Sequence, residues 1–139
     1  MIEKIRQYLI DINIFDEDCR VNVDFLGENP TEFAIEKIPV EPILEPYING
    51  DSLNQFQFQL VSCNDYGADV LQNMSNSLFY ENLYNLIEKN NKLKKLPEIK
   101  GIQTIECLNN GGIINAEANT ARYAIQMRIT YYHIEGGVL

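Results

Sequence analysis

An uninterrupted alternation of polar and apolar residues at positions 54–60 constrains the fold of this chain more than any other segment. A β-strand turns successive side chains to opposite faces, so the alternation separates the segment into two faces. One face consists of Phe56, Phe58 and Leu60, and the other consists of Gln55, Gln57 and Gln59. The apolar face requires a core, whereas the glutamine face offers neutral amides that donate and accept hydrogen bonds. The pattern is typical of a structural building block rather than of an enzyme.

Hydrophobic periodicity elsewhere predicts two helices and four further strands. Apolar spacings of three and four predict helices over residues 2–12 and 68–90. Strands are predicted over residues 21–25, 32–38, 54–62, 101–108 and 122–132. This order predicts a single α+β domain spanning residues 1–139, in which a mixed or mainly antiparallel sheet packs against the N-terminal helix and the long central helix.

Four of these elements carry specific expectations about which side chains face the core. The long helix is expected to bury a stripe formed by Val70, Leu71, Met74, Leu78, Phe79, Leu83, Leu86 and Ile87. The first two strands are expected to form a hairpin around a turn at 27–30, with Val21, Val23, Phe25, Phe33 and Ile35 inward. The last strand is expected to turn Tyr123, Ile125, Met127, Ile129 and Tyr131 inward, and Arg122, Gln126, Arg128 and Thr130 outward.

Residues 39–51 are predicted to form an extended, flexible arm. Pro39, Pro42 and Pro46 interrupt regular pairing because proline lacks a backbone donor. The arm also contains Ile43, Leu44, Tyr47 and Ile48, which indicates that it lies against something. The arm packs either on its own domain or on a neighbouring subunit. The last residues, 134–139, are expected to form a mobile tail.

The net charge of −9 argues against a general nucleic-acid binder, which needs a basic surface. The acidic excess serves either solubility or the lining of a lumen through which DNA slides. Cys19, Cys63 and Cys107 form no CxxC pair, so a zinc or redox motif is not indicated. No signal peptide or membrane-length apolar run is present, and we expect a protein with reduced thiols that folds in the cytoplasm.

The inventory for catalysis is small. His133 is the single histidine, so no multi-histidine metal site is available, and any triad has one candidate base. Gly111 and Gly112 lie in no phosphate-binding frame. We therefore expect neither enzymatic activity nor a cofactor, and a small-ligand enzyme is the disfavoured alternative.

Several segments together resemble a known family. These are residues 2–9 (IEKIRQYL), 21–27 (VNVDFLG), 55–58 (QFQF), 66–73 (YGADVLQN) and 121–126 (ARYAIQ). They are similar to small proteins encoded in the tail-morphogenesis clusters of phages and prophages of Gram-positive bacteria. The similarity covers nearly the whole chain and includes no catalytic signature.

The resemblance implies a tail terminator, also called a neck protein, of a phage or a phage-tail-like bacteriocin. Such a subunit forms a ring, typically a hexamer, that caps the head-proximal end of the tail tube and ends its polymerisation. The implied partners are further copies of the chain, the tail tube protein, the sheath protein of contractile tails and a head–tail connector. The implied location is the virion or tail-like particle, assembled in the bacterial host cytoplasm.

The residues expected at a subunit or tube interface are Ile43, Leu44, Tyr47, Ile48, Gln55, Gln57, Gln59, Arg122 and Arg128. Two alternatives stay open at this point. A head-completion or stopper protein between portal and tail shares the ring and the acidity. A small regulatory binding module is a stable monomer instead.

Overall fold

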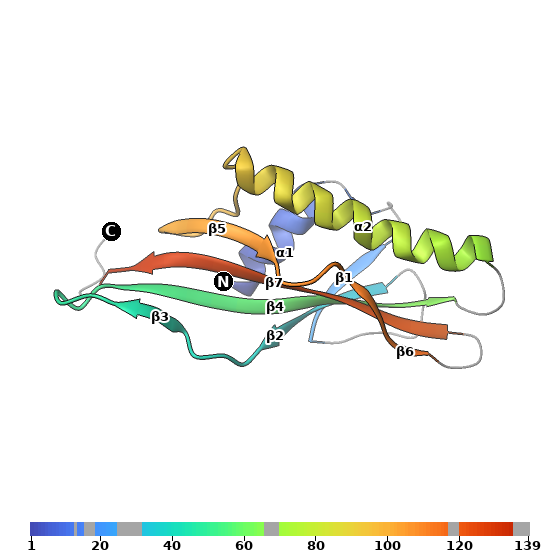
Figure 1. Ribbon diagram of the computed structural model, residues 1–139, viewed down its shortest axis with the longest axis horizontal. Helices are drawn as coiled ribbons and strands as arrows, with labels where there is room; N and C mark the ends of the chain where they lie inside the picture. Colours follow the sequence, from blue (N-terminus) through green and yellow to red (C-terminus); the bar gives the residue numbers. More distant parts are fainter. Residues whose placement is uncertain (13, 16–18, 25–31, 66–69, 117–119, 135–139) are drawn as a thin grey trace.

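The computed structural model (Figure 1) describes residues 1–12, 14–15, 19–24, 32–65, 70–116 and 120–134. Its elements are α1 (Ile2–Asp11), β1 (Arg20–Val23), β2 (Glu32–Ile38), β3 (Ile43–Pro46), β4 (Ser52–Asp65), α2 (Val70–Lys92), β5 (Ile102–Cys107), β6 (Gly112–Ala116) and β7 (Thr120–His133). The seven strands of these residues form one sheet, and both helices pack on the same face of it. The expected α+β fold, with an N-terminal and a long central helix, is confirmed.

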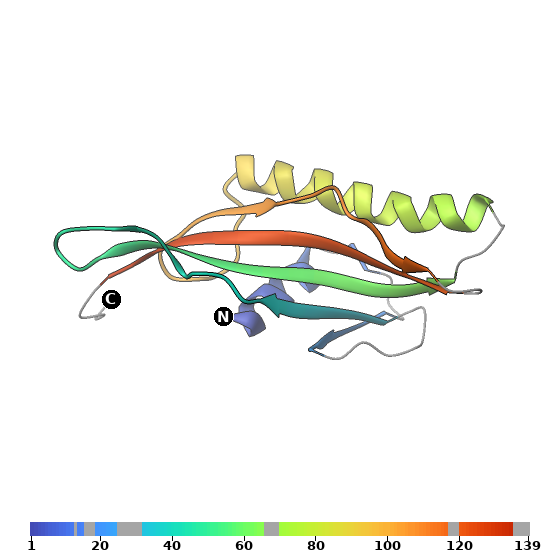
Figure 2. The same ribbon diagram turned by 60° about the horizontal axis from the view of Figure 1, so that its bottom comes forward.

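Two long antiparallel strands form the centre of the sheet. β4 and β7 pair along their whole length, from Ser52 opposite His133 to Asp65 opposite Thr120. β2 and then β1 extend the sheet beyond β4, and β5 extends it beyond β7. The short strands β3 and β6 pair with the beginnings of β4 and β7, respectively. Figure 2 shows β3 at one end of this long pair and β6 near the other.

The core lies between the two helices and one face of the sheet. From the helices it includes Ile5, Leu9, Tyr80, Leu83 and Ile87. From the strands it includes Val21, Phe33, Ile35, Phe58, Leu60, Ile105, Ala121, Tyr123, Ile125, Met127 and Ile129. Each large apolar side chain buried in this way contributes about 1.5–3 kcal/mol relative to exposure. The predicted inward faces of the two central strands are confirmed, with Phe56 and Tyr131 half-buried.

A buried hydroxyl contact ties α2 to the sheet. The Tyr80 ring stacks on the Tyr123 ring with 5.8 Å between centroids, and its hydroxyl lies 2.5 Å from the Ser62 Oγ. Burial raises the pKa of the Tyr80 phenol above its ordinary value, so the group stays neutral. Gly111 makes room beside this ring: its φ is +79°, and a Cβ there would lie 2.9 Å from the Tyr80 Cβ. A side chain at this position is excluded on both grounds.

The expected buried stripe of α2 is wrong in its first half. Met74 and Leu78 point to solvent, with exposed fractions of 62% and 52%. Between residues 74 and 92 the buried residues of this helix are Asn76, Tyr80, Leu83, Ile87 and Asn90, at alternating spacings of four and three. Polar and amphipathic residues occupy inward positions because the fold gives them partners. Asn90, for example, donates to the Tyr8 hydroxyl at 3.1 Å. The side chains of Val70 and Leu71 lie outside the described part of the chain.

The expected hairpin between the first two strands is also wrong. β1 and β2 pair in parallel, with Val21 opposite Phe33 and Val23 opposite Ile35. Val23 is exposed rather than inward, and β1 ends there, while Phe25 and the turn at 27–30 lie outside the described residues. Alternation defines the two faces of a strand but not its direction relative to a neighbour, so the pattern alone did not distinguish the two pairings.

Residues 43–46 of the expected arm form a strand. β3 pairs antiparallel with β4, and the turn between them is closed by the Tyr47 N–H, which donates to the Asp51 carbonyl at 2.8 Å. Pro42 precedes β3 and Pro46 is its last residue, at the edge of the sheet, where a missing donor is tolerated. We call residues 43–54 the β3–β4 hairpin. β6 was not predicted either, and most of the expected C-terminal tail, residues 135–139, lies outside the described residues.

The corrected face of α2 gives a direct test. We expect Leu83→Ala to lower the free energy of unfolding by about 2–5 kcal/mol, because the side chain is fully buried. Leu78→Ala, the same chemical change on the exposed face, is expected to stay within about 0.5 kcal/mol of the parent. Urea unfolding followed by circular dichroism measures both. Equal losses for the two variants would contradict the orientation of the helix.

Candidate functional site

The face of the sheet opposite the helices carries a polar surface, which we call the open face. In the described part of the chain no helix covers it, as Figures 1 and 2 show. Its side chains form rows across the strands, because directly opposed residues share a face. The rows are Glu36–Gln59–Gln126, Gln57–Arg128–Glu106 and Gln55–Thr130–Thr104. Four of the predicted interface residues, Gln55, Gln57, Gln59 and Arg128, therefore lie together.

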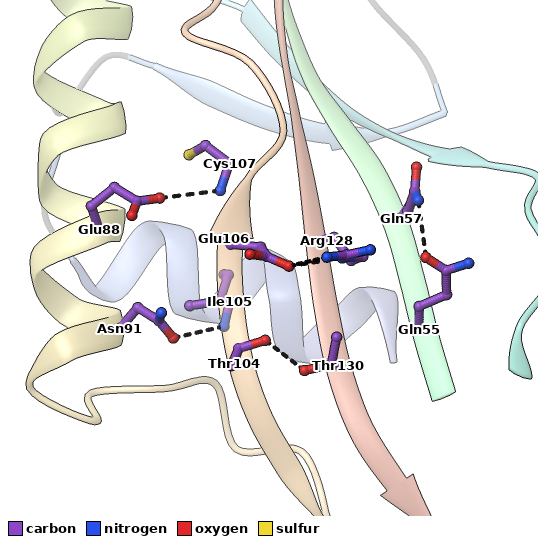
Figure 3. A network of polar contacts seen from close by, with 10 residues as sticks. All are labelled: Gln55, Gln57, Glu88, Asn91, Thr104, Ile105, Glu106, Cys107, Arg128 and Thr130. Carbon is purple, nitrogen blue, oxygen red and sulfur yellow. Dashed lines mark hydrogen bonds and ion pairs between the residues drawn. The ribbon is translucent and has the colours of Figure 1, made fainter. Parts of the chain in front are cut away.

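The charged members of the middle row neutralise each other. The Arg128 Nη2 and Nε donate to the Glu106 Oε1 at 2.5 and 2.8 Å (Figure 3). Both side chains are about one-third exposed, at 30% and 34%. A pair this accessible to water contributes at most about 1 kcal/mol to stability. Its main effect is local, because it leaves the centre of the open face without a net charge.

The glutamines form hydrogen bonds with one another and with residues 39–42, the proline-rich connection between β2 and β3. The Gln57 Nε2 donates to the Gln55 Oε1 at 3.0 Å (Figure 3), and the Gln59 Nε2 donates to the Glu36 Oε1 at 3.2 Å. Gln55 in turn donates from its side chain to the Glu41 carbonyl at 2.7 Å. Its backbone N–H also donates to a carbonyl of this connection. Gln55 therefore fixes the segment that leads from β2 to β3.

The β3–β4 hairpin exposes all four of the apolar residues predicted to lie at an interface, namely Ile43, Leu44, Tyr47 and Ile48. Ile48, at the tip, is fully exposed. Tyr47 is held within the chain, because its ring packs beside that of Tyr132 with 6.4 Å between centroids. The other three side chains belong to no core cluster of the described residues. Exposed apolar groups gathered at a projecting tip are typical of a contact surface.

A shallow groove of about 450 Å³ separates β2 from this hairpin. It is lined by Lys37, Ile38, Pro39, Val40, Pro42, Gln55, Phe56, Gln57 and Tyr131. The Lys37 ammonium lies 5.7 Å from the centre of the Phe56 ring. The lining offers apolar contact and one cation but no arrangement of nucleophile and base, so the groove suits packing rather than chemistry.

Arg122, the ninth predicted interface residue, lies away from the others. It is opposite Cys63, near the end of β4 that is remote from the hairpin. The structure therefore brings eight of the predicted residues to one half of the sheet and leaves Arg122 beside β6. Sequence reasoning missed Ile113 and Ile114 of β6, which are both exposed. Two adjacent isoleucines directly after a glycine turn were the signal for this strand.

The groups with catalytic potential are dispersed or unreactive. Burial, followed by the nearby Glu88 and Glu106 carboxylates, raises the pKa of Cys107 to about 12, so this thiol is protonated at neutral pH. His133 is exposed at the end of β7. No group of three potential metal ligands gathers among the described residues. The absence of enzymatic activity stays a prediction that these features support.

Neither a family model nor a curated protein sequence matches the chain. Among the described residues, neither helix has the length and apolar character needed to cross a membrane. Any functional conclusion therefore depends on the geometry described above and on the resemblance of the sequence segments.

The state of Cys107 can be measured by its rate of alkylation. Its pKa lies above the ordinary thiol value, so the reactive thiolate is scarce at pH 8 and increases about tenfold per pH unit. We expect alkylation of Cys107 by iodoacetamide to keep accelerating from pH 7 to 10, as measured by peptide mass spectrometry. The same peptide from urea-unfolded protein is the control. A rate that levels off below pH 9 would indicate an activated thiol and reopen the case for a nucleophile.

Proposed function

We propose that this chain is a structural subunit that forms a ring, which caps the head-proximal end of a tail tube. The resemblance implies that the ring has six copies. In this role it stops tube polymerisation and offers the head or collar a surface for attachment. The observation that carries the proposal is the half-covered sheet, because the polar rows of the open face and the apolar hairpin have no partner layer among the described residues. The apolar row Ala34–Val61–Ala124, towards the β6 end of this face, is buried. The segments that resemble tail-morphogenesis proteins supply the identity of the assembly.

The composition of the open face supports contact with another protein. Its amides present hydrogen-bonding groups, and its central charges are already paired within the face. Docking on such a surface avoids the cost of removing water from isolated charges. We therefore assign the open face to the tail tube and the hairpin to the neighbouring subunit.

The proposed passage of DNA through the ring bears on the orientation of the subunit. A lumen that DNA crosses without sticking needs negative charge. The centre of the open face is neutral, whereas the β3–β4 hairpin and its approach carry Glu41, Glu45 and Asp51 and no arginine or lysine from 38 to 54. Glu41 and Asp51, which flank the strand β3, are therefore the better candidates for the lumen side.

A second candidate is a head-completion or stopper protein between portal and tail, which requires the same ring and the same acidity. The two functions differ in the partner that the ring retains. Affinity purification from cells that assemble complete particles separates them. Recovery of the tube protein supports the terminator, and recovery of the portal without the tube supports the stopper.

The proposal predicts the mass and the behaviour of the pure protein. Light scattering at several concentrations is expected to give a species of about six times the 16.0 kDa chain mass, either alone or on addition of tail tube. The double variant Leu44→Ser/Ile48→Ser is expected to shift this species towards monomer, because both side chains are exposed on the hairpin. Met74→Ser/Leu78→Ser is the control, since it removes two exposed apolar side chains from α2. Unchanged rings in the hairpin variant would exclude the hairpin from the interface.

Binding to the tube is tested on the open face. Gln57→Lys adds a positive charge to the middle row, whose own charges are paired, and we expect co-sedimentation with polymerised tube protein to weaken roughly tenfold or more. The mass of the ring should not change. Asn85→Lys, on an exposed position of α2, is the control. A protein that stays monomeric in the presence of tube, or tube binding unaffected by the added open-face charge, would count against the function as proposed.

A further inference from the structure

Side chains of α2 close the outer edge of β5. The backbone N–H groups of Ile105 and Cys107 donate to the Asn91 Oδ1 at 3.2 Å and to the Glu88 Oε1 at 3.5 Å (Figure 3). An edge strand whose outward donors are occupied offers a poor template for another strand. The helix therefore protects this edge of the sheet in addition to covering its face.

The edge of β1 is closed in the same way, since the Arg6 Nε of α1 donates to the Val21 carbonyl at 2.7 Å. In the described part of the chain, no hydrogen bond from a third element reaches β3 or β6, which pair with β4 and β7, respectively. Both of these open strands expose apolar side chains. These are Ile43 and Leu44 on β3 and Ile113 and Ile114 on β6, with exposed fractions of 45%, 41%, 47% and 58%.

The two open strands lie at diagonally opposite corners of the sheet. On β3, Glu45 is opposite Leu53 of β4. On β6, Ile113 is opposite Tyr123, which is itself opposite Ser62 of β4. At about 3.4 Å per residue, Leu53 and Ser62 are about 30 Å apart along the strand. The open strands also lie on opposite edges, so they cannot meet within one molecule, but they can meet between two copies.

We propose that β3 of one copy docks against β6 of the next copy and that this joint, repeated, closes the ring. The inference rests on the proposed ring and names the surfaces that build it. Two different patches that meet in this way form a heterologous contact, which closes when successive rotations complete a circle. The offset of about 30 Å between the corners requires the strands to be inclined to the ring axis, as strands are in closed barrels.

The side chains of the two corners match when the sheet continues from one copy to the next. On the face that carries the helices, Ile43 of β3 would meet Ile113 of β6. Ile43 is opposite Asn54 and Ile113 is opposite Tyr123, and both of these partners lie on that face. On the open face, Glu45 would approach Arg122, the charged residue among those described between 108 and 126. β3 and β6 run in opposite directions within the sheet, so they would meet antiparallel. Apolar groups therefore face apolar groups, and the acidic hairpin faces a cation.

Each open strand is irregular at one residue. The register of β3 shifts at Leu44, and that of β6 shifts at Ile114, so an exposed apolar residue stands at both bulges. A bulge interrupts the regular ladder of hydrogen bonds. We therefore expect side chains, rather than a long intersubunit ladder, to hold the joint.

Cross-linking tests the joint in the assembled protein. In the variant Leu44→Cys/Ile114→Cys, a short bis-maleimide is expected to link successive copies into a ladder that ends at the size of the ring. Each single variant controls for links to Cys19, Cys63 or Cys107 and should give no ladder. Leu44→Cys/Met74→Cys controls for random encounters, because Met74 is as exposed as Ile114 but lies on the outer face of α2.

A charge exchange gives an independent readout. Glu45→Arg should shift the mass of the assembled protein towards monomer, and Glu45→Arg/Arg122→Glu should restore the ring. A ring of unchanged mass with no ladder and no response to Glu45→Arg would overturn this joint while leaving the proposed function intact. A protein that is monomeric under all conditions, including in the presence of tail tube, would overturn both.

Discussion

The antiparallel pair of β4 and β7 is the constraint on which the rest of the structure depends. Four of the five other strands pair with one of these two, and β1 joins the sheet through β2. The register of the pair places Phe58 opposite Met127 and Gln57 opposite Arg128. A shift of one strand by one residue would move its glutamines into the core and its apolar residues to the open face. Each buried amide without a partner would then cost about 1–3 kcal/mol, so the two faces and their register define each other.

The two helices protect the sheet unequally, and this inequality leaves open the surfaces that the proposed assembly would use. They cover one face with apolar side chains and also close two of the outer edges, through Arg6 on α1 and through Glu88 and Asn91 on α2. β3 and β6 lie at the extremities of the long pair and receive no such protection in the described residues. Proteins usually blunt exposed edges to prevent unwanted association. Protection of two edge strands with exposure of two others is the arrangement that the proposed joint between copies requires.

The sequence predicts the elements with strict periodicity and fails where the fold supplies partners that no local pattern contains. Strict alternation identified β4 and β7, and their inward residues are correct because a strand has only two faces. The buried face of α2 was misassigned because Asn76 and Tyr80 satisfy their polar groups inside the protein, whereas Met74 and Leu78 are exposed. Prolines suggested an irregular arm, yet Gln55 holds the segment through two hydrogen bonds that join residues distant in the sequence. The exposure of the hairpin residues Ile43, Leu44, Tyr47 and Ile48 follows from local composition, and their role in an interface stays a prediction. The β6 corner required knowledge of the pairing.

The nature of the open face helps to distinguish a docking surface from a merely solvated one. A face that serves solubility alone gains from unpaired charge, and the chain has a net charge of −9 to supply it. Instead, the central rows contain glutamines and threonines, and the Arg128 cation is matched by Glu106 within the same row. Neutral amides are less costly to remove from water than isolated charges, and they still impose geometry on a partner. The acidic groups of the hairpin lie instead beside the apolar corner, where a cation on the next copy would select the correct docking. A neutral face and a charged corner favour different partners, so their separation would let the proposed subunit bind each partner at its own surface.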